Sequence, residues 1–296
     1  MDSTHNKRLN VSAGIASIAV ALILVAAKGW AWAETGALTV AASLIDSALD
    51  LVVSMANFGA ILYAAKPADE DHRFGHHSIE DIAALAQALM VAAAGVMLGW
   101  RGIERLFAPE PLASESAGIA VMTLSILLTG ALVWWQRRVA LQTGSKVVAA
   151  DSLHYLTDLL PAVGGIVALA ASALFGVVQL DSAISLVAAV VLLRGAWQIG
   201  GGAFAALMDR AAPDEVEHKI AAIVAGFPEI EGFHDLKTRV SGARTFVQLH
   251  IELDGAQTLF DAHAVGARLR LSILEAVPGS EVLVHKDPSG DGGTQR

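Results

Sequence analysis

The chain has 296 residues, of which 54% are hydrophobic and 17% are charged, and its mean hydropathy is +0.55. A typical soluble domain is about 25% charged, so this composition argues against a soluble globular protein and favours one embedded in a membrane. The chain has no cysteine, which excludes disulfides and thiolate metal sites.

Six apolar stretches follow one another over the first two thirds of the chain. Each is long enough to cross a bilayer as a helix, which takes about 20 residues. A chain this short could not bury six helices that are apolar all round without lipid, so we set aside a large soluble helical protein. The expected spans are residues 10–32, 37–64, 80–106, 115–137, 146–173 and 179–206.

The basic residues predict the orientation of these spans. The polar segment 1–10 runs directly into the first span without a small-residue cleavage site, so we expect no removed signal peptide. Lys and Arg favour the cytoplasmic side of a membrane, and seven of them lie on the side of the N-terminus against two on the other. Both termini are therefore expected in the cytoplasm. The seven are Lys7, Arg8, Lys66, Arg73, Arg137, Arg138 and Lys146, and the two are Arg101 and Arg105.

The composition changes after residue 208. We expect a transmembrane domain over residues 1–208, a cytoplasmic domain over 209–290 and a flexible tail over 291–296. From residue 209 onward fourteen acidic residues outnumber nine basic ones, which argues against nucleic acid or anionic lipid as a partner. The pattern predicts an α+β fold of order αββαβ, with helices at 213–225 and 259–276, strands at 233–240, 245–253 and 281–286, and a hairpin turn at 241–244.

Two polar pairs interrupt the apolar spans. Asp46 and Asp50 are the only charged residues between positions 37 and 65, and their spacing of four places them on one helix face. His154 and Asp158 repeat this spacing in the fifth span. Ionisable groups at membrane depth normally face a bundle interior or an aqueous cavity. With no fixed cation evident beside them, the four residues predict a zinc-like, four-coordinate site for a divalent metal. Hydrogen bonding to the backbone or to neighbouring helices is the alternative.

The loop between the second and third spans, PADEDHRFGHHSIED, carries further potential metal ligands. Asp69, His72 and His76 fall within eight residues, and Gly75 allows a tight bend among them. These residues could bind a second metal at the membrane surface. Spacing alone leaves open the alternative of a solvated polar loop.

Four histidines and one aspartate of the cytoplasmic domain could also converge. His250 is expected on the strand face opposite the apolar residues, and His285 and Asp287 share a face because they are two residues apart. Any one of these histidines alone is more simply a surface residue, but together they favour a metal site. The full set is His234, His250, His263, His285 and Asp287.

These landmarks resemble, in the right order and over nearly the whole chain, the cation diffusion facilitator family, in particular its bacterial zinc, iron and cadmium efflux members. The stretches that carry the resemblance are AWAETGALTVAASLIDSALD, DEDHRFGHHSIED, ADSLHYLTD and LMDRAAPDE. The resemblance implies a homodimeric, proton-coupled exporter of the bacterial inner membrane with a ferredoxin-like cytoplasmic domain. It also implies three metal sites. The transport site consists of Asp46, Asp50, His154 and Asp158, and the loop site of Asp69, His72 and His76. The cytoplasmic site is binuclear and consists of His234, His250, His263, His285 and Asp287, and Asp287 is expected to bridge two ions across the domain interface.

The sequence departs from the family pattern at one position. Many relatives carry a lysine just after the loop-site glycine-histidine pair, matched with an aspartate at the end of the sixth span. Here the aspartate is present as Asp209, but the lysine position is Ser78. We therefore expect the interlock of the dimer near the membrane to be weaker or held otherwise. Arg194, within the sixth span, is either a partner for a carboxylate or a side chain that reaches toward the membrane surface.

The expected function is export of a divalent cation from the cytoplasm in exchange for protons by alternating access. Three carboxylates and one imidazole suit zinc, cadmium or ferrous iron. The histidine of the fifth-span pair resembles zinc-type members of the family, so zinc is the expected ion. An intramembrane metalloenzyme would need a motif such as HExxH, which is missing. A membrane-bound metal sensor or scaffold that does not transport remains the alternative function.

Overall fold

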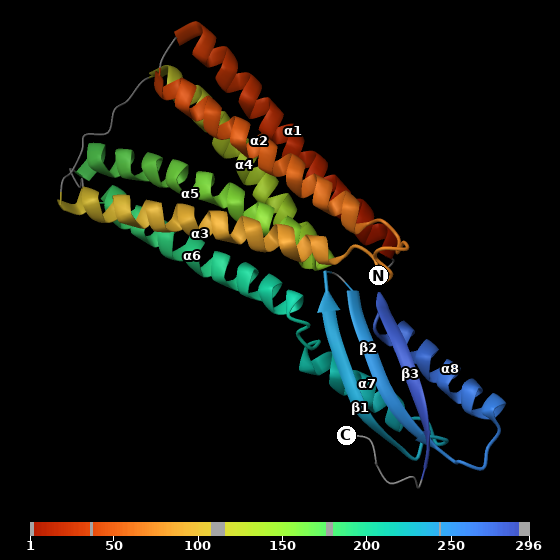
Figure 1. Ribbon diagram of the computed structural model, residues 1–296. Helices are drawn as coiled ribbons and strands as arrows, with labels where there is room; N and C mark the ends of the chain where they lie inside the picture. The colour runs from red at the N-terminus through yellow and green to blue at the C-terminus, as the bar shows by residue number, and fades with distance from the viewer. Residues whose placement is uncertain (1–2, 36–37, 108–115, 176–179, 243, 290–296) are drawn as a thin grey trace. The chain divides into compact units, whose positions relative to one another are not determined.

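The computed structural model describes residues 3–35, 38–107, 116–175, 180–242 and 244–289 (Figure 1). The described chain divides into two compact units, one of residues 6–204 and one that contains residues 205–289. The predicted tail over 291–296 lies outside the described residues.

A long helix occupies each of the six predicted ranges. The shortest of these helices has 27 residues, about 40 Å at 1.5 Å per residue, which exceeds the roughly 30 Å of a bilayer's hydrocarbon core. Within the described residues, α1, α2, α3 and α6 have both the length and the apolar composition of a membrane span. The helices are α1 (Ser3–Thr35), α2 (Leu38–Ala64), α3 (Ser78–Phe107), α4 (Ser116–Thr143), α5 (Lys146–Phe175) and α6 (Leu180–Leu207).

The helical unit places apolar side chains outside and many polar ones inside. Leu49, Val96 and Val190 are more than half exposed, whereas Gln136 and Asp151 are at most 3% exposed. In water this distribution would leave a large apolar surface unprotected, but in lipid it buries that surface. α5 contacts α2, α3 and α4, so it forms the centre of the packing.

The second unit has the predicted αββαβ order. β1 (Gly232–Ser241) pairs antiparallel with β2 (Arg244–Leu253), and β2 pairs parallel with β3 (Ser280–Pro288), giving the sheet order β1-β2-β3. The two helices are α7 (Asp214–Ala225) and α8 (Leu259–Ala276). The predicted hairpin turn is formed where Ser241 pairs with Arg244, and Gly242 within it has a φ of 54°; residue 243 is outside the described residues.

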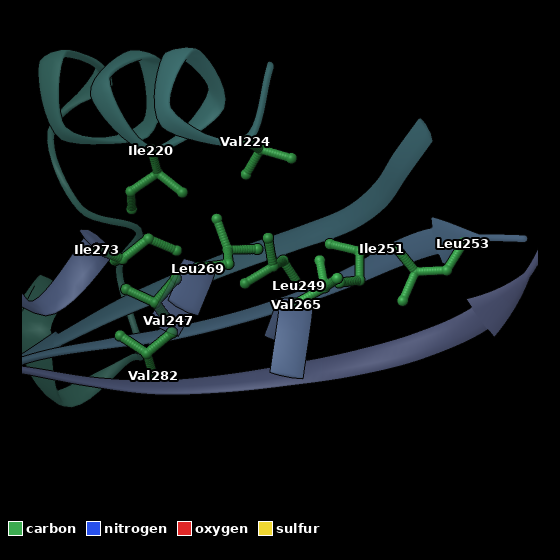
Figure 2. Packing of buried hydrophobic residues seen from close by; sticks show 10 residues of the cluster. All are labelled: Ile220, Val224, Val247, Leu249, Ile251, Leu253, Val265, Leu269, Ile273 and Val282. Carbon is green, nitrogen blue, oxygen red and sulfur yellow. The ribbon is translucent and has the colours of Figure 1, made fainter. Parts of the chain in front are cut away.

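The core of this unit lies between one face of the sheet and both helices (Figure 2). The alternation of β2 turns its apolar residues toward the helices and leaves His250 and Glu252 for the opposite face. The core residues are Ile220 and Val224 of α7, Val265, Leu269 and Ile273 of α8, Val247, Leu249, Ile251 and Leu253 of β2, and Val282 of β3. The face opposite the helices is therefore free for polar side chains.

Truncation of Ile251 tests this core. Because Ile251 is fully buried, Ile251→Ala should cost about 2–5 kcal/mol, whereas Leu283→Ala, at a position 63% exposed on β3, should cost under about 1 kcal/mol. Hydrogen-exchange mass spectrometry of the intact protein should show faster exchange in β2 and α8 for the first variant only. Equal exchange in both variants would contradict the packing described here.

Candidate metal sites

The two helices predicted to face each other meet at Asp50 of α2 and His154 of α5. His154 Nε2 lies 3.2 Å from Asp50 Oδ1, and the two side chains are only 13% and 16% exposed. Ligand atoms on a tetrahedral zinc, each about 2.0–2.1 Å from the ion, are roughly 3.3 Å apart. This pair therefore has the spacing of two ligands of one metal ion.

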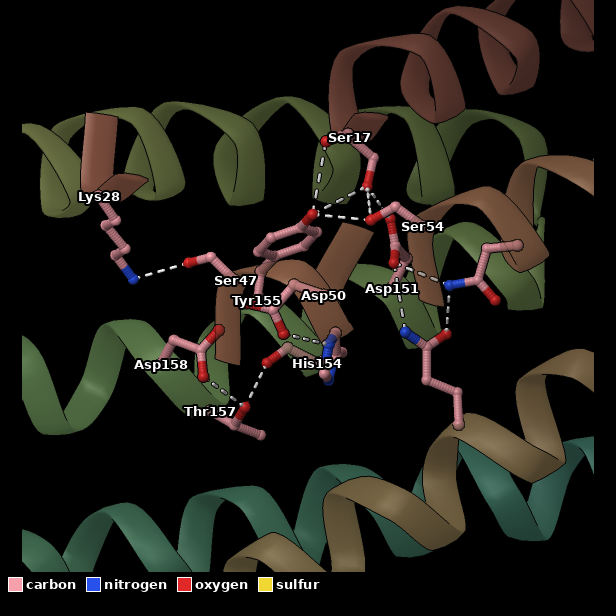
Figure 3. Close-up of polar contacts among 12 residues, drawn as sticks. Ser17, Lys28, Ser47, Asp50, Ser54, Asp151, His154, Tyr155, Thr157 and Asp158 are labelled. Atoms are coloured by element: carbon pink, nitrogen blue, oxygen red, sulfur yellow. Dashed lines mark hydrogen bonds and ion pairs between the residues drawn. The ribbon is translucent and has the colours of Figure 1, made fainter. Parts of the chain in front are cut away.

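The other two predicted ligands, Asp46 and Asp158, do not complete a four-ligand metal site with this pair. Asp158 interacts electrostatically with Asp50 and His154, and its Oδ1 accepts a hydrogen bond of 3.3 Å from Thr157 (Figure 3). Asp46 is exposed on α2, one turn before Asp50. Among the described residues the four predicted ligand atoms do not all lie within 4.8 Å of one another. A bound ion would have to draw the outer two carboxylates inward.

A lysine lies beside these carboxylates, and the expectation that no fixed cation accompanies them is wrong. Lys28 of α1 donates a hydrogen bond to Ser47 Oγ of α2 at 2.7 Å (Figure 3) and another to the Ser43 carbonyl of the same helix at 3.2 Å. Its ammonium group also interacts electrostatically with Asp50, Asp158 and Asp46. Sequence spacing missed Lys28 because it belongs to another helix, whose rotation about its own axis the sequence leaves open.

A second buried carboxylate, Asp151 of α5, joins five helices. It is 3% exposed, and one of its oxygens accepts hydrogen bonds from Asn57 at 2.8 Å and Gln87 at 3.2 Å. The other oxygen accepts from Gln136 at 2.5 Å and from Ser17 at 2.8 Å, and Figure 3 draws the bond from Ser17. These four donors belong to α2, α3, α1 and α4 respectively.

The network around Asp151 holds the helix that carries His154. Tyr155, which adjoins His154, places its hydroxyl 2.7 Å from Ser54 Oγ of α2. Ser54 Oγ in turn is 2.8 Å from Ser17 Oγ. Polar residues isolated within apolar helices, such as Asn57 and Gln87, are the sequence signal that could have revealed this network.

The structure brings together the three predicted loop residues. His76 Nε2 is 3.2 Å from Asp69 Oδ2, and His72 Nδ1 is 3.5 Å from Asp69 Oδ1. These separations again match the roughly 3.3 Å between ligands of one zinc ion. The backbone N–H of His72 donates to Asp69 and lowers the pKa of that carboxyl. Gly75 has a φ of 84°, so the bend at this point requires glycine or another residue tolerant of that conformation.

The register of the cytoplasmic sheet places three histidines side by side. His234 pairs with His250 across β1 and β2, and His250 pairs with His285 across β2 and β3. Neighbouring rings have centroids 5.0 and 4.5 Å apart. Asp287 lies among them, with 2.9 Å to His250 Nδ1, 3.4 Å to His234 Nε2 and 3.1 Å to His285 Nε2. A β-bulge between His234 and Lys237 interrupts β1 directly after the first histidine.

The five predicted cytoplasmic ligands do not converge within the described part of one chain. His234, His250 and Asp287 have ligand atoms within 4.8 Å of one another, and His285 contacts Asp287. His263 is on α8, which packs on the other face of the sheet. At Asp287, burial raises the pKa, but hydrogen bonding to His250 and the nearby histidines outweigh it, so the pKa is lowered overall.

The remaining predicted positions have simpler surroundings. Asp209 Oδ1 accepts from Arg239 Nη1 of the same chain at 3.2 Å, so its carboxylate already has a partner. Ser78 is the first residue of α3, and close by Lys146 Nζ donates to the buried Asp81 at 2.6 Å. Arg194 is exposed on α6.

Comparison with known proteins finds a transmembrane domain followed by a cytoplasmic domain. Residues 14–208 match the family described as the cation efflux transmembrane domain, and residues 212–289 match the cytoplasmic domain of cation efflux proteins. The cation-efflux pump FieF of Serratia proteamaculans is 38% identical over 95% of this chain and 93% of its own, and FieF of Klebsiella pneumoniae is 39% identical over 95% and 94%. The solved metal-bound C-terminal domain of the CzcD transporter from Thermotoga maritima is 28% identical and aligns over 27% of this chain and 93% of its own, but its TM-score of 0.26 adds nothing to this assignment.

The apolar helices and the sequence matches define a multi-pass membrane transporter rather than an enzyme. The chain belongs to the cation efflux family, also called the cation diffusion facilitators, and its activity is the efflux of divalent metal cations.

Asp151→Asn tests the buried network. An amide in place of the carboxylate turns an N–H₂ toward donors and leaves at least one of them unpaired, which costs about 1–3 kcal/mol per group. The melting temperature in detergent should fall by roughly 5–10 °C, given about 2–4 °C per kcal/mol for a unit of this size. Ser152→Ala is the matched control, because Ser152 Oγ is buried without a hydrogen-bond partner among the described residues. Equal melting temperatures in the two variants would contradict the assigned role of Asp151.

Proposed function

We propose that this protein exports zinc from the bacterial cytoplasm across the inner membrane in exchange for protons. In this proposal residues 1–208 cross the membrane six times, residues 209–290 form a ferredoxin-like cytoplasmic domain, and both termini lie in the cytoplasm. The observation that carries it is the close pair Asp50–His154 within the helical unit, because two potential metal ligands from two apolar helices are 3.2 Å apart there. Asp46 and Asp158 are the ligands that would complete the site.

The transport step follows from the chemistry of these ligands. Metal ligands must be deprotonated to bind, so an ion entering from the cytoplasm releases protons and protons entering from outside release the ion. His154 is the proposed proton carrier, because an unperturbed imidazole titrates near pH 6.5. Alternating access requires the site to open to one side at a time, and α5, which contacts α2, α3 and α4, is the helix whose movement would change the Asp50–His154 distance.

The proton gradient is large enough to drive this exchange. Each proton that enters supplies about 1.4 kcal/mol per pH unit and about 2.3 kcal/mol per 100 mV. Concentrating a divalent ion tenfold costs about 1.4 kcal/mol before its own charge is counted. One unit of pH therefore supports export against one to two orders of magnitude when more than one proton is exchanged.

The donor set is the basis for proposing zinc. Oxygen and imidazole ligands with the spacing of a tetrahedral site suit zinc, and the absence of thiols disfavours copper(I). Cadmium and ferrous iron accept similar ligands and are the alternative substrates. Flux measurements with each ion would rank them.

The cytoplasmic histidine cluster is proposed as a sensor that joins two chains. The cluster lies on the sheet face left open by the helices, and the cytoplasmic region from residue 209 has a net charge of −5. Metal bound there would reduce repulsion between two such acidic domains. His263, which is separated from the cluster within one chain, could then act in a homodimer as a ligand of a site shared between chains.

A sensor that does not transport is the competing function, and Asp50→Ala separates the two. In proteoliposomes with an internal zinc dye and an imposed pH gradient, we expect the substitution to reduce zinc flux at least 100-fold, because it removes a ligand of the transported ion. Glu104→Gln on α3, whose carboxylate bonds to Trp100 away from the site, should leave flux within about twofold of wild type. Zinc binding without gradient-driven movement in the wild type would favour the sensor.

Small-angle scattering tests the sensor hypothesis. Zinc should reduce the radius of gyration of the wild-type protein, and His285→Ala combined with Asp287→Ala should remove this effect because the shared cluster is lost. His218→Ala is the control, since this exposed histidine of α7 lies outside the cluster. Zinc-dependent compaction that survives in the double variant would exclude these residues as its cause.

The pH dependence of zinc binding at the cytoplasmic cluster has a defined sign. The lowered pKa of Asp287 keeps its carboxylate ionised throughout pH 5–8. Loss of binding as the pH falls from 7.5 to 5.5 is therefore expected from protonation of imidazole ligands, because a free imidazole side chain titrates near pH 6.5. Isothermal titration should show affinity falling at least tenfold over this range, and an affinity independent of pH would rule out histidine ligation.

A further inference from the structure

Lys28 is a charged group next to the transport site that the exchange mechanism above does not use. It lies on α1, is partly buried, and is about two turns from the end of that helix. Both of its hydrogen bonds go to α2, one to Ser47 Oγ (Figure 3) and one to the Ser43 carbonyl. Ser47 adjoins Asp46 and precedes Asp50 by one turn, so the ammonium group is held at the level of the carboxylates.

The simpler explanation for a lysine near the end of a membrane helix is that its ammonium group extends to the lipid headgroups. A side chain doing this would direct its ammonium toward water, along the lipid-facing surface. The Lys28 ammonium instead bonds to a neighbouring helix and interacts electrostatically with Asp50, Asp158 and Asp46. The geometry therefore favours an interior role over surface anchoring.

The charges around this point define what the site can hold. The three carboxylates of Asp46, Asp50 and Asp158 together with the Lys28 ammonium carry a net charge of −2 when all are ionised. One divalent cation cancels this charge, whereas a monovalent ion leaves −1. Uncompensated charge at membrane depth costs several kcal/mol. Without Lys28, the same site would retain a net charge of −1 after binding a divalent ion.

We propose that Lys28 is the resident counter-cation of the transport site, and that its fixed positive charge weakens metal binding enough for the ion to be released on the far side. This inference rests on the proposed transport site. The ammonium repels the incoming divalent ion and offsets part of the carboxylate charge while the site is empty. Lys28 thus determines charge selectivity and affinity without being a ligand.

Zinc affinity of Lys28 variants tests the proposal. The binding of zinc to full-length protein in nanodiscs is measured by competition with a chelating dye, in a background with His76→Ala and Asp287→Ala to silence the other two clusters. Lys28→Gln should bind zinc about tenfold more tightly than this background and transport it more slowly, because a repelling charge has been removed. Lys28→Met, which is similar in length and uncharged, should do the same, and Lys28→Arg should stay within about twofold of the background.

Controls separate a charge effect from a structural one. Lys146→Gln removes a partly buried lysine that pairs with Asp81 outside the site, and it should not raise zinc affinity. A structural disturbance at Lys28 would lower affinity and melting temperature together, opposite to the predicted gain. Unchanged or weaker binding in both Lys28→Gln and Lys28→Met, or a gain in Lys28→Arg equal to theirs, would overturn the proposal.

The same experiment distinguishes failure of the inference from failure of the proposed function. Asp50→Ala in this background should abolish zinc binding if the transport site is correctly placed. Binding that survives Asp50→Ala would refute the transport site itself. Binding that requires Asp50 but is unaffected by neutral substitutions at Lys28 would refute only the role of the lysine.

Discussion

A carboxylate within the hydrocarbon core of a bilayer must have its charge compensated, and the arrangement of this protein's membrane unit follows from that constraint. Two aspartates of α5 have their charge compensated in two different ways. Asp151 is satisfied by hydrogen bonds from four neutral side chains on four other helices. Asp158, two turns further along α5, interacts electrostatically with Asp50, His154 and Lys28, and the carboxylates of this group outnumber its one lysine. The first arrangement is fully hydrogen-bonded and structural, whereas the second is incomplete, which is why we propose that it binds and releases an ion.

In the cytoplasmic unit, strand pairing and not charge compensation brings the potential metal ligands together. A three-stranded sheet covered by helices on one face leaves its other face open. The pairing of β1, β2 and β3 brings one histidine from each strand into a row, with Asp287 contacting all three. Unlike the acids in the membrane, these residues lie where water can compensate their charge, so they need no metal to be tolerated. This difference is the reason why we propose a sensor role for the cluster, since a sensor must bind and release metal as its concentration changes.

Much of the fold and part of the site could be predicted from the sequence. Hydropathy predicted the helical ranges, and the spacing of four predicted that the two members of each polar pair share a helix face. The structure brings one residue of each pair together, Asp50 and His154. Lys28 escaped prediction because sequence leaves open how α1 is rotated against α2. His263 was grouped with residues on the other face of the sheet, although Val265, Leu269 and Ile273 mark the buried side of α8 by their spacing. The row of histidines needed the strand register and the β-bulge after His234, which depend on pairing between distant segments.

The most direct test of the central claim is to locate zinc in the folded protein. An anomalous difference map recorded at the zinc edge from crystals grown with zinc should show one peak per chain between Asp50 and His154, with Asp46 and Asp158 drawn to within about 2.0–2.2 Å of the ion. Zinc peaks only at the loop and cytoplasmic clusters, with no peak beside Asp50 and His154, would contradict the claim that these residues bind the ion.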